Sequence, residues 1–435
     1  MDKNLQGIFD NVKAYCDNNF KFDFNPANPI VRLHEPTFSH EEINVAVATM
    51  LSTFVTMGKQ NREFEELYAK KFGHKYGVTN NSGSSANLLA VATLANPATP
   101  NHLKPGDEVI VPSLSWSTTV WPLVQHGLVP VFVDCDLKTF NLDLEKLEKA
   151  ITPKTRAIKL VHVYGNPCDM DPLLEIAKKH NLFVIEDSCE SMGAKYKGKY
   201  VGSFGDIGTF SFFFSHHITT LEGGICTTDN FDYAETMRVL RAHGWSREAD
   251  EKQKYIDMYP EIDPRFIFIN HGYNVRITEV QAAMGKEQLK KFDAIAARRR
   301  RNAELYRKGL EEFSDLFHFQ EEMHDSESTW FGYGLVLKEN VKFDLKEINA
   351  YLQSNKIETR PIIAGNMTKH PALKMFDHRI AGTLENSDKI MQRGFAFGCH
   401  HAINDEGCAY VIEQIKNFIK TKYESTQESN QKAFV

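Results

Sequence analysis

Short apolar runs alternate with amphipathic stretches through the first two thirds of the chain. The runs are rich in β-branched residues, and each has about the length of one buried strand: Glu108–Pro112, Val129–Asp134, Ala157–Tyr164, Leu182–Asp187, Gly208–Phe213 and Gly224–Thr227. Continuous apolar runs between helical segments are typical of parallel strands that helices cover on both faces. The pattern therefore predicts an α/β fold with a mainly parallel sheet.

The pattern changes in the last third of the chain. Thr278–Leu310 has the apolar periodicity of one long helix. Beyond it, the pattern predicts strands at Phe331–Leu337 and Ile357–Ile363 and helices at Leu345–Ser354 and Cys408–Thr421. We therefore expect a smaller C-terminal α+β domain behind the large one.

These patterns divide the chain into four predicted segments. They are an N-terminal extension and arm over residues 1–49, a large domain over 50–290, a small C-terminal domain over 291–422 and a flexible tail over 423–435. The tail is predicted because Glu424–Ala433 is polar and terminal.

Composition and charge narrow the expected function. Of the 435 residues, 42% are hydrophobic and 25% are charged, as in ordinary globular proteins. The 51 Lys and Arg against 57 Asp and Glu give a formal net charge of −6. No bulk positive field then exists to hold nucleic acid or an anionic membrane, so chemistry on small molecules is expected.

The first residues and the cysteines bear on the compartment. The stretch MDKNLQGIFDNVKAYC has no continuous apolar core, so it predicts neither a signal peptide nor a membrane span. Seven scattered cysteines lack the C-x-x-C spacing of a zinc or iron–sulfur site. We expect a cytoplasmic protein with reduced thiols and no metal site.

The first stretch with candidate chemistry is NNSGSSAN at residues 80–87, directly before the apolar helix LLAVATLA. Gly83, Ser84 and Ser85 would open that helix, where unpaired backbone N–H groups and hydroxyls can bind a phosphate. The same residue types also serve as ordinary helix caps, so both interpretations stay open.

The second stretch is VIEDSCE at residues 184–190, at the end of a predicted buried strand. Open α/β sheets bind ligands at the carboxyl ends of their strands. Asp187 at that position can hold a protonated ring nitrogen of a ligand. An ordinary strand-end cap is the alternative.

The third stretch is SFFFSHHITTLEGG at residues 211–224. Together with the other two stretches, in the same order, it resembles the fold-type-I pyridoxal phosphate (PLP) enzymes, specifically the nucleotide-sugar aminotransferase family. The resemblance extends from about Pro36 to about Phe418. It implies PLP fold type I, like that of aspartate aminotransferase, with PLP or pyridoxamine phosphate as the cofactor.

One position departs from the family. Five residues after Ser211, which matches the family's phosphate-binding serine, the family has the lysine that holds PLP covalently, and this chain has His216. An imidazole cannot form that bond, but it can transfer protons near neutral pH. The departure resembles a narrower group, the 3-dehydratases of nucleotide-linked 4-keto-6-deoxy sugars.

The narrower resemblance implies a reaction. PLP is held non-covalently, L-glutamate donates an amino group to it, and the C3 hydroxyl of the sugar is removed. The implied substrate is GDP-linked 4-keto-6-deoxy-D-mannose, which becomes a 4-keto-3,6-dideoxy sugar for surface polysaccharide such as lipopolysaccharide O-antigen.

The resemblance also implies roles for single residues. His216 is the implied catalytic group, and His243 is a second one. The implied contacts to the cofactor are Gly83, Ser84, Ser85, Trp116, Asp187, Glu190, Ser211 and, reaching in from a second subunit, Asn274. The implied contacts to glutamate or to the sugar's diphosphate are Arg247, Arg276 and Arg360, because a guanidinium matches both anions. A homodimer with shared active sites follows from the role of Asn274.

Other residues of the matching stretches receive an interpretation as well. Trp330 and Phe331, in STWFG, match the family as well. Because the other matching stretches occur in the same order, a functional role is favoured over that of an ordinary core aromatic. His217, next to the implied catalytic position, is expected to be structural.

Two other functions stay open. A lysine-dependent nucleotide-sugar aminotransferase would need an amine near Glu222–Gly224, and the nearest lysines, Lys195, Lys197 and Lys199, precede the strand before it. The second open function is that of a catalytically inactive binding protein with the PLP fold, since an enzyme that has lost its activity can also lose the lysine. A related enzyme that acts on a CDP-linked sugar carries a [2Fe–2S] cluster, but Ser246–Asn270 contains no cysteine, so no iron–sulfur cluster is expected.

Overall fold

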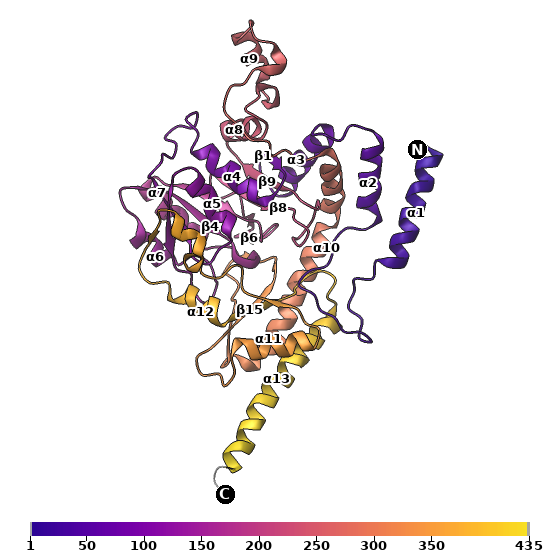
Figure 1. Cartoon of the computed structure of the whole chain (residues 1–435), viewed down its shortest axis with the longest axis vertical. Coiled ribbons are helices and arrows are strands. Elements are labelled where there is room, and N and C mark those ends of the chain that lie inside the picture. The colour runs from indigo at the N-terminus through magenta and orange to yellow at the C-terminus, as the bar shows by residue number, and fades with distance from the viewer. Residues whose placement is uncertain (1, 433–435) are drawn as a thin grey trace.

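The computed structural model describes residues 2–432, with side chains described as far as Tyr423. Within this part of the chain, an 8-stranded sheet and a 4-stranded sheet each form the centre of a hydrophobic core, and a 3-stranded sheet is hydrogen-bonded to neither. The helix α10 (Glu279–Leu310) runs from one core to the other (Figure 1). It matches the long helix that the sequence predicts.

The large sheet confirms the predicted fold class. Its order is β1-β9-β8-β5-β4-β2-β3-β14, and β9 runs in the opposite direction to the other seven strands. The strands are β1 (Tyr76–Asn80), β2 (Glu108–Pro112), β3 (Val129–Val133), β4 (Thr155–Val161), β5 (Phe183–Asp187), β8 (Ile207–Ser211), β9 (Gly224–Thr228) and β14 (Arg379–Ile380). Because the other strands are parallel, their carboxyl ends meet at one edge of the sheet.

Helices cover both faces of this sheet, as continuous apolar strands require. One face packs on α4 (Gly83–Leu94), α5 (Ser117–Gln125) and α8 (Phe231–Arg241). The other face packs on α6 (Leu144–Ala150), α7 (Met170–His180), α3 (Lys59–Lys71) and the first half of α10.

The smaller sheet has the order β10-β12-β15-β13 and packs on α11, α13 and the second half of α10. Its elements are β10 (Phe317–Phe319), β12 (Tyr333–Leu337), α11 (Leu345–Ser354), β13 (Thr359–Arg360), β15 (Gly394–Phe397) and α13 (Asp405–Lys432). The small third sheet contains β6 (Lys195–Tyr196), β7 (Lys199–Tyr200) and β11 (Ser326–Glu327).

The predicted strand over Ile357–Ile363 is wrong in its extent, because only Thr359–Arg360 pairs as β13. Pro361 follows directly and has no N–H to donate to a ladder. Ile363 then has a φ of 47°, which turns the chain out of the extended conformation. The apolar content of the sequence alone does not predict that the strand ends at Arg360.

The chain after α11 returns to the large sheet. β14 pairs in parallel with β3, and the Arg379 guanidinium donates two hydrogen bonds to the Glu108 carboxylate at 2.9 and 2.8 Å. α12 (Glu385–Arg393) begins where Asp134 accepts hydrogen bonds from Ser387 N and Oγ at 2.9 and 2.7 Å. The predicted boundary at 290/291 falls inside α10, and the division into domains stays a prediction, as does the tail, of which residues 433–435 lie outside the described chain.

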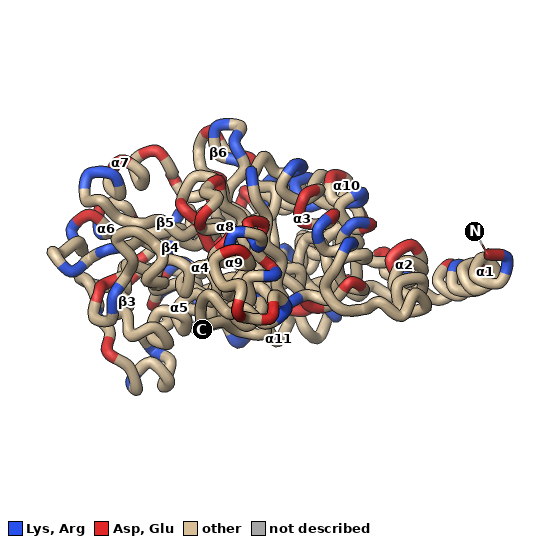
Figure 2. The backbone as a smooth tube through the Cα atoms, turned by 90° about the horizontal axis from the view of Figure 1, so that it is seen from above, with Lys and Arg blue, Asp and Glu red and all other residues tan. Residues whose placement is uncertain are grey.

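Two elements lie at the periphery. α1 (Lys3–Asn19) lies outside α2 (His40–Leu51) (Figures 1 and 2), and α9 (Lys252–Met258) projects from the body of the protein (Figure 1). Lys and Arg are interspersed with Asp and Glu over the backbone in Figure 2. In the part of the chain that is described, no helix has both the length and the apolar character to cross a bilayer.

Candidate active site

A pocket of about 360 Å³ opens at the carboxyl edge of the large sheet. Its walls come from the ends of β4, β5 and β8, the beginnings of α4 and α5, and two residues near the smaller sheet, Phe331 and Arg360. This is the edge where open α/β sheets bind ligands, and the volume is that of a site for a small molecule.

The beginning of α4 forms one wall. Ser82 caps the helix, and its Oγ accepts a hydrogen bond from Ser85 N at 3.1 Å. A Cβ added to Gly83 would lie 2.5 Å from Ser211 Cβ, so only glycine lets the helix approach β8 this closely. Ser84 Oγ lies 3.2 Å from Thr118 Oγ1 and, like Ser82 and Ser211, lines the pocket. Hydroxyls and free backbone N–H groups thus surround one end of the cavity.

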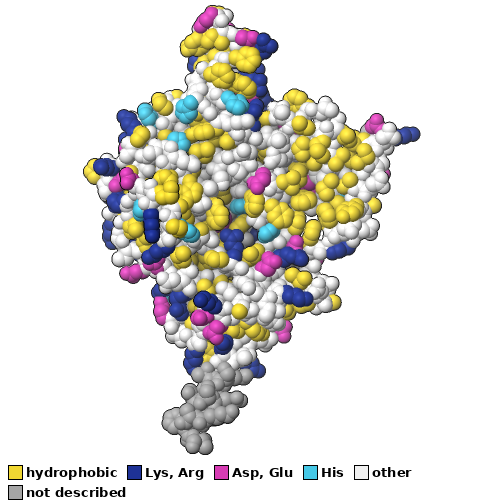
Figure 3. Space-filling view, viewed as in Figure 1, with side chains coloured by type: hydrophobic (Ala, Val, Ile, Leu, Met, Phe, Trp, Pro, Cys, Tyr) yellow, Lys and Arg dark blue, Asp and Glu magenta, His cyan; other side chains and the backbone are white. Residues whose placement is uncertain are grey.

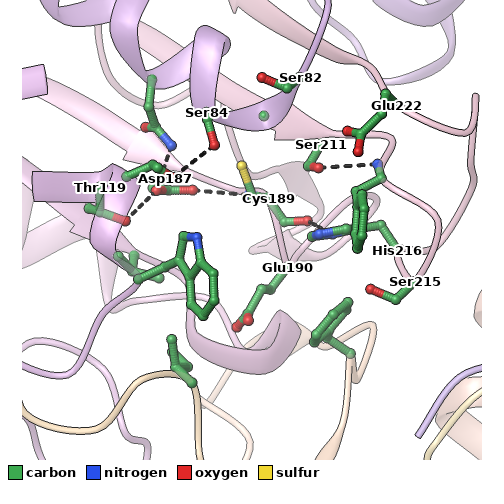
Figure 4. Close-up of a pocket in the computed structure, with 18 of the residues that line it drawn as sticks. Ser82, Ser84, Thr119, Asp187, Cys189, Glu190, Ser211, Ser215, His216 and Glu222 are labelled. Carbon is green, nitrogen blue, oxygen red and sulfur yellow. Dashed lines mark hydrogen bonds between the residues drawn. The ribbon is translucent and has the colours of Figure 1, made fainter. Parts of the chain in front are cut away.

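Asp187 ends β5 and is held by three donors. Its Oδ2 accepts hydrogen bonds from Asn87 Nδ2 at 3.0 Å and from Thr119 Oγ1 at 2.7 Å, and its Oδ1 accepts one from Cys189 N at 3.3 Å (Figure 4). Sequence reasoning missed Asn87 and Thr119. The carboxylate is 5% exposed and oriented from two different helices.

His216 lies across the pocket from Asp187. Its Nδ1 is 2.7 Å from the carbonyl oxygen of Cys189, which can only accept, so Nδ1 carries the proton (Figure 4). Its ring lies 4.9 Å from that of Phe331. Burial lowers the pKa of His216 to about 4. At neutral pH the imidazole is therefore uncharged, and Nε2 is an unprotonated base with no hydrogen bond to any described residue.

Three more predicted residues line the same pocket. Burial raises the pKa of Glu190 to about 7, and its carboxylate accepts a hydrogen bond from Tyr164 N at 3.1 Å. Arg360 also lines the pocket, with its guanidinium 6.0 Å from the Phe331 ring. Trp116 lines the pocket and is 52% exposed.

The other predicted residues lie outside this pocket. Ser85 Oγ donates to Asn81 Oδ1 at 2.6 Å. The remaining four gather with Trp245 in what we call the basic surface cluster, made up of His243, Trp245, Arg247, Asn274 and Arg276. Within it, Arg276 lies 3.1 Å from Asn274 Oδ1 and 3.3 Å from His243 Nε2, and the Arg247 guanidinium lies 4.2 Å from the Trp245 ring.

The structure separates the two aromatic residues of the STWFG stretch. Phe331 lines the pocket, but Trp330 packs in the core of the smaller sheet and does not. The functional interpretation of Trp330 is therefore wrong for this pocket, and the ordinary interpretation of a core aromatic holds. His217 is fully buried, with Nε2 3.1 Å from the carbonyl oxygen of Thr329, which fits the structural role expected.

The fold and pocket are those of a PLP-type family. The DegT/DnrJ/EryC1/StrS aminotransferase family profile matches residues 36–416, and the chain belongs to this family. GDP-4-keto-6-deoxy-D-mannose 3-dehydratase of Yersinia pseudotuberculosis is 43% identical over 391 residues, which cover 88% of this chain and 96% of that relative. GDP-perosamine synthase of Caulobacter vibrioides is 37% identical over 335 residues, covering 77% and 84%. The resemblance inferred from the sequence is confirmed.

A solved structure extends the comparison to three dimensions. E. coli GDP-4-keto-6-deoxy-D-mannose 3-dehydratase with bound hydrated PLP matches with a TM-score of 0.84 at 38% identity, over 88% of this chain and 98% of that one. The pocket described above fits the same cofactor on its own chemistry. At Gly83 the helix lies so close to β8 that no Cβ would fit, which brings the hydroxyls of Ser84 and Ser211, suited to a phosphate, to one end of the pocket, and the buried carboxylate of Asp187 also lines it.

Proposed function

We propose that this protein is a PLP- and glutamate-dependent 3-dehydratase that acts on GDP-4-keto-6-deoxy-D-mannose and makes the 4-keto-3,6-dideoxy sugar. One observation carries the proposal. The pocket is lined by an uncharged imidazole, His216, and no lysine is among its described lining residues. The site keeps a proton-transfer group and lacks the amine that aminotransferases of the family use to anchor PLP.

The chain's own residues hold the cofactor. Ser84, Ser211 and the first N–H groups of α4 bind the phosphate, and Asp187 pairs with the ring nitrogen. Trp116 covers the exposed face of the ring. When bound there, PLP supplies an electron sink that eases proton loss and bond cleavage at carbons next to the amino group it carries.

His216 moves the protons. Nδ1–H stays on the Cys189 carbonyl, which fixes the tautomer and the plane of the ring, and Nε2 accepts a proton from the reacting carbon. The protonated Nε2 can then donate to the leaving C3 hydroxyl. Because burial disfavours the charged imidazole, it gives the proton up readily.

Two sets of groups support binding of the substrates. Arg360 lines the pocket and can bind a carboxylate or diphosphate oxygen there. The basic surface cluster carries two more guanidinium groups outside the pocket. In the proposed homodimer, this cluster of one subunit completes the pocket of the other.

Exposed apolar side chains support the dimer. Around α9 they include Met258, Tyr259, Phe266 and Phe268, and after α2 they include Phe54 and Val55. Apolar side chains gather on the face shown in Figure 3, over α9 and in the region of α2 and α3. Exposed apolar patches of this kind are typical of surfaces that a partner covers.

The net reaction balances without an outside reductant. Replacement of the C3 hydroxyl by hydrogen takes up two electrons, and oxidation of glutamate to 2-oxoglutarate and ammonia releases two. The experiment is to incubate the purified protein with PLP, glutamate and the GDP-linked sugar in air, and to follow the three products.

We expect one 2-oxoglutarate and one ammonia for each sugar that loses its C3 hydroxyl, and no turnover without glutamate. The CDP- and dTDP-linked sugars in parallel reactions decide the nucleotide. A product that retains the amino group on the sugar would instead show an aminotransferase, and absence of any glutamate-dependent change would show a binding protein.

A further inference from the structure

A lysine is buried in the large sheet, on the strand next to the one that ends in Asp187. Lys159 lies near the end of β4, is 0% exposed and has no hydrogen-bond partner for Nζ among the described residues. It does not line the pocket, so it is not a replacement for the missing anchoring lysine. An ammonium in this position costs free energy, because it has lost water and gained no acceptor.

The register of the sheet places Lys159 near Asp187. β4 pairs in parallel with β5, so Lys159 is opposite Ile185 and Val161 is opposite Asp187. Side chains alternate along a strand, so Lys159 and Asp187 point to the same face of the sheet. Strand spacing and rise put their Cα atoms about 8 Å apart, a separation that a lysine side chain can largely span.

Charge connects the two groups. The titratable groups whose charges act on Lys159 are Asp187, Cys189 and Cys226, and Asp187 has the largest of these effects. Burial lowers the pKa of Lys159 to about 8. The ammonium is therefore still mostly protonated at neutral pH.

We propose that Lys159 is a positioning residue, a buried cation on the same face of the sheet as Asp187 that keeps the Asp187 carboxylate oriented toward the ring nitrogen of PLP. The inference rests on the proposed binding of PLP. Asn87 and Thr119 orient the carboxylate through neutral hydrogen bonds, and Lys159 supplies the charge that they lack. The attraction between the ammonium and the Asp187 carboxylate then offsets the free-energy cost of burying the ammonium.

A double-mutant cycle on PLP binding tests this role. The dissociation constant of PLP is measured at neutral pH by absorbance titration for the unchanged protein, Lys159→Met, Asp187→Asn and the double variant. Met keeps the length of the side chain and removes its charge. We expect Lys159→Met to weaken PLP binding roughly tenfold, the order expected for two charges at this separation inside a protein.

The background of Asp187→Asn separates the electrostatic role from a structural one. With a neutral Asn at 187, Lys159→Met should change the dissociation constant less than twofold. Equal weakening in both backgrounds, or no weakening in either, overturns the inference. If the unchanged protein does not bind PLP at all, it is the proposed function that fails.

Two further variants control the measurement. Lys154→Met, just before β4 and exposed, removes the same charge from the chain and should leave PLP binding unchanged. A thermal unfolding scan of apo Lys159→Met shows that the variant is folded before its affinity for PLP is compared with that of the unchanged protein. If Lys159→Met does not fold, Lys159→Gln takes its place in the cycle with the same expectations.

Discussion

The protonation state of His216 separates proton transfer from cofactor retention. The ring is fixed through Nδ1, and Nε2 is uncharged at neutral pH because burial lowers the pKa of the imidazole to about 4. In the proposed function, retention of PLP depends instead on the beginning of α4 and on Asp187. The two roles that one lysine combines elsewhere in the family are here assigned to different elements.

Replacing His216 tests this separation. His216→Asn should bind PLP with nearly unchanged affinity, while the rate of sugar dehydration falls at least a hundredfold, as for loss of a general acid–base group. Absorbance titration and product assays measure the two effects. In His216→Lys, borohydride reduction followed by mass spectrometry should find PLP on residue 216, whereas the unchanged protein should carry it on no lysine.

Glu190 gives a prediction about stability. Burial raises its pKa from 4.5 to about 7. Between these values the unfolded chain loses its proton before the native protein does, so the native state loses stability as the pH rises through this window. Glu190→Gln removes that loss. The apo variant should match the unchanged protein below pH 4.5 and exceed its free energy of unfolding by about 3 kcal/mol above pH 7.

Denaturant unfolding at pH 4.5 and at pH 8 measures the difference. The matched control is Glu175→Gln on the exposed side of α7, which should change the stability little at either pH. A constant difference between Glu190→Gln and the unchanged protein would contradict the assigned titration.

Among the elements that line the pocket, the beginning of α4 has a strict steric requirement. A Cβ at position 83 would lie 2.5 Å from Ser211 Cβ and 2.9 Å from its Oγ, so Gly83→Ala must push Ser211 away from the phosphate. We expect PLP affinity to fall at least tenfold in this variant, from the loss of about one charge-assisted hydrogen bond. Gly7→Ala, in α1 with open space around it, is the control and should bind PLP normally.

The same elements show what the sequence could predict. Buried parallel strands have unbroken apolar sequences, so the predicted ends of β2, β5 and β9 agree with the structure to within one or two residues. The ends of β5 and β8 then place Asp187 and Ser211 at one edge. Asn87 and Thr119 could not be found, because they contact Asp187 across 100 and 68 residues of sequence, and nothing local marks either contact.

At the scale of the whole molecule, the basic surface cluster predicts complementation between subunits. A mixed dimer of Asn274→Ala and His216→Asn contains one pocket in which both residues are intact. If each variant alone is inactive, equal mixing with subunit exchange should restore about a quarter of the full activity. No recovery, or a protein that is monomeric at micromolar concentration in light scattering, would contradict the shared site.

The return of the chain to the large sheet has a consequence for how the protein is made. Asp134 is synthesised early, yet Ser387, which donates to it, follows 253 residues later. Until the ribosome has released the segment that contains β14 and Ser387, the backbone groups at the β3 edge are unpaired. The Asp134 carboxylate, which is buried in the folded protein, is also still exposed. During synthesis the β3 edge of the large sheet therefore stays unpaired until β14 has been made. A chaperone that shields open sheet edges would bind the chain at this stage.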